Sequence, residues 1–126
     1  WMMAWLLRRR IKIMKLDEVV RALQLTEVVP AQKPGLEVSG GYASDMLSNA
    51  MGQAAPGQIW ITMQGHPNVA AVASLLNLAG VIVAGAASVA PETVQKAKTN
   101  GVALFTTALP AYEVCGRLYA LGVGKP

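Results

Sequence analysis

Gln64, His66 and Asn68 are the three polar residues whose spacing best fits a small-ligand site. They follow a strand candidate that ends at Met63, and Pro67 fits the first turn of a helix. Open α/β sheets bind ligands where strands end and helices begin, and free backbone N–H groups at a helix start attract anions. We therefore predict a small anionic ligand at this position. Capping of the helix by His66 or Asn68 is the alternative.

A second candidate is Ser39 with the adjacent glycines Gly40 and Gly41, inside a strand-like stretch. Glycine permits a positive φ, a bulge, or the close approach of a ligand or another backbone. A tight bend into a helix capped by Ser44 or Asp45, or a subunit contact, would also explain the pair. The predicted site lies between this bend and residues 64–68, at the carboxyl edge of a parallel sheet, and its binding residues are Ser39, Gly40, Gly41, Gln64, His66 and Asn68.

The residues that most enzymes need are scarce in this chain. It has one histidine, His66, and one cysteine, Cys115, whereas a metal site needs three or four ligands. Cys115 falls on the apolar side of the last helix, which is typical of a buried structural thiol. No phosphate loop, dinucleotide fingerprint or nucleophile elbow occurs. We therefore predict no catalytic residue, no metal and no cofactor. A minimal enzyme that uses His66 is a third hypothesis.

Strands and helices alternate along the chain from residue 58 to residue 122. Strands are predicted over residues 58–63, 81–83 and 102–106. Each is followed by a helix that starts at a proline and ends at a glycine, and these pairs are Pro67 with Gly80, Pro91 with Gly101, and Pro110 with Gly122. Parallel strands need such crossover helices, so the pattern predicts a three-layer α/β/α sandwich with a mainly parallel sheet. Upstream, the sequence predicts helices over 16–23 and 45–51 and strands over 25–29 and 37–43.

The composition fits one small domain. The chain has 126 residues, of which 53% are apolar and 14% are charged, which supports a modest core. No apolar run reaches the ~18 residues that a transmembrane helix needs. A single cysteine favours a reducing compartment, so we predict a cytoplasmic protein. A chain this apolar is expected to expose more apolar surface than a small core can hide, which predicts a homodimer.

The net charge of +4 comes from a short N-terminal cluster, because seven basic and seven acidic residues balance one another after residue 13. Nucleic-acid binders carry basic residues across their folded surface, so we predict no nucleic-acid binding. Residues 1–13, apolar and then arginine-rich, are predicted to be an extension in front of a single domain over residues 14–126. The alternatives for the extension are a cover for an apolar patch of a second subunit and a membrane-surface anchor.

Two stretches in this order resemble the DRTGG domain family. The Asp-Arg-Thr-Gly-Gly run that names the family corresponds to residues 37–41, Glu-Val-Ser-Gly-Gly, and its Gly-Tyr-x-x-Asp-Leu-Leu-Ser continuation corresponds to residues 41–48. The family's Trp-Ile-Thr-x-Gln-x-His-x-Asn stretch corresponds to residues 60–68, Trp-Ile-Thr-Met-Gln-Gly-His-Pro-Asn. The resemblance covers about residues 14–123, which is nearly the whole chain after the extension.

The resemblance implies an α/β/α domain similar to the N-terminal domain of HPr serine kinase/phosphorylase and to modules beside CBS domains in some inorganic pyrophosphatases. It implies a non-catalytic regulatory or oligomerisation module. Combined with the site predicted at the helix start, this gives our main hypothesis, a module that senses a small anionic ligand. The alternative is a nucleotide- or UDP-type ligand-binding domain. The Arg and Asp of the family run are Val38 and Glu37 here. An anion held by that Arg in relatives cannot be held in the same way by this chain.

Overall fold

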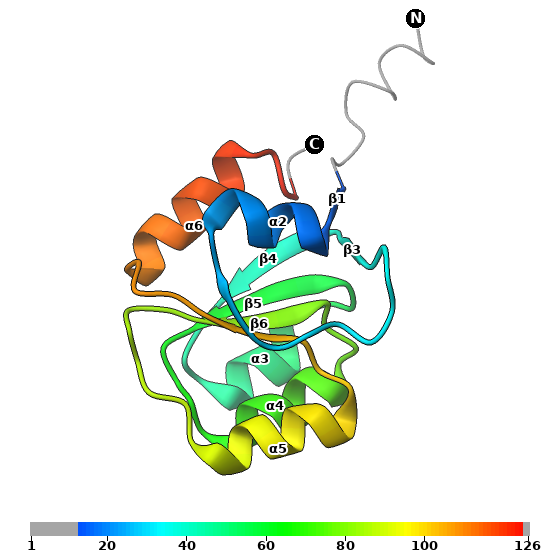
Figure 1. Cartoon of the computed structure of the whole chain (residues 1–126), viewed down its shortest axis with the longest axis vertical. Coiled ribbons are helices and arrows are strands. Elements are labelled where there is room, and N and C mark those ends of the chain that lie inside the picture. The colour runs from blue at the N-terminus through cyan, green and yellow to red at the C-terminus, as the bar shows by residue number, and fades with distance from the viewer. Residues whose placement is uncertain (1–12, 125–126) are drawn as a thin grey trace, which may run out of the picture.

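The computed structural model describes residues 13–124, which form a five-stranded sheet with helices on both faces (Figure 1). The spatial order of the strands is β2 (Thr26–Val29), β7 (Leu104–Thr106), β6 (Gly80–Val83), β5 (Gln58–Thr62) and β4 (Gly40–Ala43). β2 is antiparallel to β7, and all other neighbours are parallel. The α/β/α sandwich with a mainly parallel sheet that the sequence predicts is confirmed.

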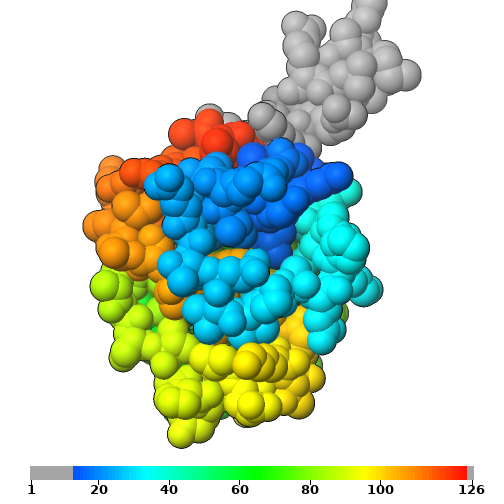
Figure 2. Space-filling view, viewed as in Figure 1, coloured from blue at the N-terminus to red at the C-terminus, as the bar shows by residue number. Residues whose placement is uncertain are grey.

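Two helices cover one face of the sheet and three cover the other (Figure 1). The first face carries α2 (Leu16–Leu23) and α6 (Ala111–Ala120), and the second carries α3 (Leu47–Gln53), α4 (Pro67–Leu75) and α5 (Pro91–Asn100). A two-stranded ribbon, β1 (Met14–Lys15) with β3 (Glu37–Val38), precedes β4. In the space-filling view, the segment between α2 and β3 crosses the molecule between α2 and α5 (Figure 2).

The side chains of β5 alternate between the two cores. Trp60 is fully buried in the core shared with α3, α4 and α5, whereas Ile59 and Ile61 belong to the core shared with α2 and α6. All four residues of β6 are buried, as expected of a central parallel strand covered on both faces. Burial on both faces of the sheet explains the continuous apolar run at residues 81–83.

The predicted boundaries of two helices are wrong. Asn77, with φ 56°, follows the last turn of α4 in the left-handed conformation, and Gly80 is instead the first residue of β6. A Cβ atom at Gly80 would lie 3.3 Å from the carbonyl oxygen of Ala103, so the glycine serves strand packing. The helix predicted from residue 45 begins at residue 47, because the Asp45 side chain binds the end of β5. Gly101, with φ 71°, ends α5 as predicted.

Gly40 and Gly41 do not form the predicted bend. Both lie in β4 and pair with Gln58 and Ile59 of β5 in a regular parallel register. The interruption of the predicted strand falls at Ser39, between β3 and β4. The glycine pair therefore lies at the amino end of an edge strand.

Residues 1–12, which contain nearly all of the predicted extension, lie outside the described residues. Within residues 13–124, no helix is both long enough and apolar enough to pass through a membrane.

Candidate functional site

His66 lies immediately before α4 and caps its first turn. Its Nδ1 accepts a hydrogen bond from the backbone N–H of Asn68 at 3.1 Å, and its carbonyl oxygen accepts one from the N–H of Val69 at 3.0 Å. Pro67 has no N–H, so the first two N–H groups of α4 already have acceptors. His66 therefore caps α4, as the alternative interpretation of the sequence stated. The side chains of Gln64, His66 and Asn68 are nevertheless exposed.

The loop between β5 and α4 packs against the loop that follows β6. The carbonyl oxygen of Gly65 accepts hydrogen bonds from the hydroxyl of Thr93 at 2.5 Å and from the N–H of Ala90 at 3.2 Å. A Cβ atom at Gly65 would lie only 2.0 Å from the carbonyl oxygen of Ser88. The two backbones are in direct contact, and no side chain fits at Gly65.

Asp45 joins the carboxyl end of β4 to that of β5. Its Oδ1 accepts hydrogen bonds from the hydroxyl of Thr62 at 2.7 Å and from the N–H of Met63 at 2.8 Å. Because Thr62 is buried, Asp45 satisfies a hydroxyl that water does not reach. Sequence reasoning assigned Asp45 only a possible capping role. The signal it missed is that Asp45 is the one charged residue between residues 38 and 91.

The two halves of the predicted ligand site lie at opposite ends of the strands. Gly40 pairs with Gln58, the first residue of β5, whereas Gln64 comes after Thr62, the last residue of β5. At ~3.3 Å per residue, the length of β5 keeps them at least ~13 Å apart. The prediction that residues 39–41 and residues 64–68 share the carboxyl edge of the sheet is therefore wrong. Ligand binding by either group alone stays a prediction.

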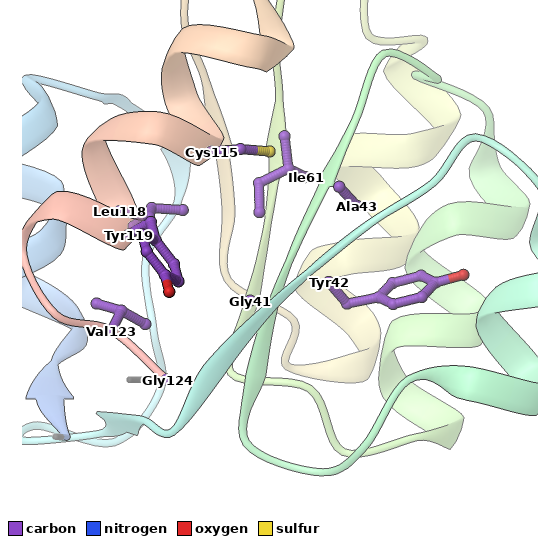
Figure 3. Close-up of a pocket in the computed structure, with 9 residues that line it drawn as sticks. All are labelled: Gly41, Tyr42, Ala43, Ile61, Cys115, Leu118, Tyr119, Val123 and Gly124. Atoms are coloured by element: carbon purple, nitrogen blue, oxygen red, sulfur yellow. The ribbon is translucent and has the colours of Figure 1, made fainter. Parts of the chain in front are cut away.

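A cavity of about 350 Å³ lies between β4 and α6 (Figure 3). This α6–β4 cavity is lined by Gly41, Tyr42, Ala43, Ile61, Cys115, Leu118, Tyr119, Val123 and Gly124. The strand side is open because Gly41 and Ala43 offer little or no side chain. The ring of Tyr42 points the other way, and its hydroxyl donates to Asn49 of α3 (Figure 3). None of the lining residues has a charged side chain.

The glycine pair of β4 gives room to the C-terminal segment of the same chain. Gly124 has φ +76°, and a Cβ atom there would lie 3.2 Å from the Cα atom of Gly40. Of the explanations that the sequence offers for the pair, the close approach of another backbone is therefore present. Gly124 and Gly41 both belong to the wall of the cavity.

Cys115 contributes its thiol to the wall of the α6–β4 cavity (Figure 3). Burial raises the pKa of this thiol above its ordinary value, which keeps it protonated and unreactive at neutral pH. His66 caps a helix on the other face of the sheet, so the two side chains do not form a Cys–His pair. Across residues 13–124, no three or more His, Cys, Asp or Glu side chains gather in a group that could hold a metal ion.

The fold matches part of a known regulatory region. The comparison structure contains the CBS and DRTGG domains of the regulatory region of Clostridium perfringens pyrophosphatase, complexed with its activator diadenosine tetraphosphate, and the TM-score is 0.68. The sequences are 17% identical, and the match covers 88% of this chain and 46% of that chain, so this chain spans about half the length of the other. The chain has a DRTGG-type fold. Neither a scan against family models nor a search of curated proteins found a match.

Residues 37–41, which resemble the run that names the DRTGG family, comprise β3, Ser39 and the first two residues of β4. Val38 is fully buried in the core shared with α2 and α6, so the side chain at this position does not face a ligand in solvent. The N–H of Ser39 donates to the carbonyl oxygen of Gly57 at 3.0 Å, just before β5 begins. In this chain the segment holds the start of β4 against β5.

Proposed function

We propose that this chain is a non-catalytic regulatory module that self-associates as a homodimer and senses a small ligand. The observation that carries the proposal is the fold shared with the regulatory region of the C. perfringens pyrophosphatase. A regulatory module acts by coupling ligand binding to assembly or shape. We further propose that residues 14–126 form a single domain and that the protein works in the cytoplasm.

The α6–β4 cavity is the position that we propose for the ligand. Its volume of about 350 Å³ falls within the range of small-molecule pockets, roughly 300–1,000 Å³. Its wall includes Gly41, one of the residues predicted from the sequence to bind a ligand. Because the wall has no charged side chain, an uncharged ring suits it better than a phosphate, whose burial without a partner is costly.

These properties favour a nucleotide whose base enters the cavity and whose phosphate stays in solvent. The pyrophosphatase region is complexed with diadenosine tetraphosphate, a ligand that has both rings and phosphates. This preference supports the nucleotide-type alternative more than recognition of a small inorganic anion. The exposed group of Gln64, His66 and Asn68 stays the competing position for an anion.

An NMR titration with adenosine and with AMP tests the position of the ligand. Binding in the cavity is expected to shift the amide signals of Gly41, Leu118 and Val123 with both ligands, because the ring is the part recognised. Shifts confined to residues 64–68, and only with AMP, would contradict the cavity. The absence of any shift with either ligand would contradict nucleotide sensing.

A pair of matched variants on α6 sharpens the titration. Cys115→Leu adds bulk inside the cavity and is expected to abolish the shifts, since Cys115 lines the wall. Ala120→Leu adds the same kind of side chain at an exposed position of the same helix, and binding should persist. Equal binding by both variants would rule out the cavity.

Light scattering tests self-association. The chain mass is 13.3 kDa, and a homodimer is expected to give twice that value at micromolar protein. A monomer at every concentration would contradict this part of the proposal.

An ATP hydrolysis assay tests the non-catalytic part of the proposal. Hydrolysis by the purified chain that is lost in His66→Ala would contradict it.

A further inference from the structure

The two edges of the sheet are built differently. Edge strand β2 carries the exposed charge of Glu27, is followed by Pro30, and has an irregular register between Glu27 and Val29. A charge, a proline and a bulge each discourage another strand from pairing with an edge. The β2 edge is therefore protected against association.

Edge strand β4 has none of these three features. Its sequence, Gly-Gly-Tyr-Ala, contains no charge and no proline, and its register with β5 is regular from Gly40 to Ala43. Gly41 and Ala43 are exposed, and among residues 13–124 no strand pairs with the outer side of β4. An edge of this kind leaves backbone donors and acceptors available to a further strand.

The surroundings of the β4 edge suit a second copy of the same chain. In a twofold contact the residues nearest the axis lie beside their own counterparts, so a charge there would repel its own copy. Residues 38–91, which include β4 and α3, contain a single charged side chain, Asp45, and its Oδ1 accepts hydrogen bonds from Thr62 and Met63.

Two large apolar side chains flank the edge, one on each face of the sheet. Met46, at the start of α3, is 64% exposed, and Tyr119, on α6 beside the cavity, is 63% exposed. Such side chains lose contact with water when another molecule covers the edge, which favours association. Together with the scarcity of charge on β4 and α3, they point to a contact between like surfaces. The two charges of α6, Glu113 and Arg117, are paired with each other.

We propose that β4 pairs with β4 of a second copy of this chain. The two strands run antiparallel about a twofold axis and join two five-stranded sheets into one continuous sheet. Antiparallel pairing about a twofold axis places the same strand on both sides and satisfies the free backbone groups of both. This inference rests on the proposed self-association and names its surface.

Matched lysine substitutions on the two edge strands test the proposal in the full chain. Ala43→Lys places a charge on the β4 edge, and Thr26→Lys places the same charge at an exposed position of the β2 edge. Light scattering at equal concentrations is expected to give a monomer for Ala43→Lys and a dimer for Thr26→Lys.

The outcomes separate the interface from self-association itself. If both variants remain dimers, the β4 interface is wrong, while self-association stands. If the unsubstituted chain is a monomer at every concentration, both proposals fail. If Thr26→Lys alone becomes a monomer, the interface lies at the other edge and this proposal is overturned.

Hydrogen exchange of the unsubstituted chain provides a second test in case Ala43→Lys does not fold. Pairing of β4 with its counterpart is expected to slow exchange at residues 40–43 as protein concentration rises. Residues 26–29 of β2 serve as the internal comparison and should not respond. Equal exchange of residues 40–43 at low and high concentration, in a sample shown to dimerise, would overturn the interface.

Discussion

Gly65 brings two loops into backbone contact at the carboxyl edge of the sheet. In Gly65→Ala the added Cβ atom would start 2.0 Å from the carbonyl oxygen of Ser88 and 2.8 Å from the Cα atom of Val89. Because both obstacles are backbone atoms, the loops must separate. We expect the substitution to lower the free energy of unfolding by ~1–3 kcal/mol, measured by urea denaturation.

The matched control is Gly52→Ala in α3, where no atom lies within 4 Å of the added Cβ. Alanine restricts the unfolded chain more than glycine does, so this variant should be more stable by roughly 0.5–1 kcal/mol. A Gly65→Ala variant as stable as the control would mean that the two loops are not in contact.

Cys115 gives the protein a pH-dependent reactivity. Burial raises the pKa of its thiol, and only the thiolate reacts with iodoacetamide. Alkylation at neutral pH is therefore expected to be slower than that of a free cysteine and to accelerate as the pH rises. Mass spectrometry of the time course measures it, and a rate equal to that of free cysteine would contradict the burial of the thiol.

The same thiol links stability to pH. Because its pKa is higher in the folded chain, the unfolded chain loses its thiol proton first as pH increases. The protonated thiol therefore contributes to stability below the ordinary thiol pKa. This contribution is lost as the pH rises through the pKa that Cys115 has in the folded chain. Between about pH 7 and about pH 10, Cys115→Ala is therefore expected to lose less free energy of unfolding than the unsubstituted chain.

At the scale of elements, Asp45 fastens the end of edge strand β4 to β5. Asp45→Ala removes the acceptor of the buried Thr62 hydroxyl and of the N–H of Met63. An unsatisfied buried polar group costs ~1–3 kcal/mol, so we expect a loss of stability of that size in thermal or urea unfolding.

Asp17→Ala is the matched control for Asp45→Ala. Asp17 pairs with Arg21 at 3.6 Å, and both side chains are largely exposed. Exposed ion pairs contribute ~0–1 kcal/mol, so this variant should be nearly as stable as the unsubstituted chain. Similar losses in the two variants would show that the contact of Asp45 with β5 contributes little.

The helices and strands could be predicted from the sequence because their signals are local. Pro91 and Gly101 bracket α5 as predicted, and the apolar run of β6 indicated a buried strand. The site could not be placed because it depends on register. The sequence shows that Gly40 and Gly41 need space, but only the pairing with Gln58 shows that they lie at the amino end of the sheet.

The cavity had no signal of its own in the sequence. Small residues such as Gly41 and Ala43 leave space only when the element opposite them is known, and α6 lies more than sixty positions further along the chain. The role of Gly124 was missed for the same reason. The sequence indicated only that a glycine at position 41, inside a strand, has a role other than forming the strand.

At the scale of the whole molecule, the sheet joins distant parts of the chain at one place. Strands β4, β5, β6 and β7 are neighbours in sequence order, whereas the early strand β2 pairs with β7. Pairing across a long intervening chain is slow to form. We expect pulse-labelled hydrogen exchange during refolding to protect residues 59–62 and 81–83 before residues 26–29, and the reverse order would contradict this.

The pairing of β2 with β7 also affects the chain while it is being synthesised at the ribosome. β2 emerges early and has no partner until β7, the last strand, has been translated. Throughout that interval it is a nascent strand that other chains could capture. Glu27, Pro30 and the irregular register beside Val29 then act on the unfinished chain as well as on the finished sheet. We expect these features to discourage β2 from pairing with a wrong strand while its own partner is still being made.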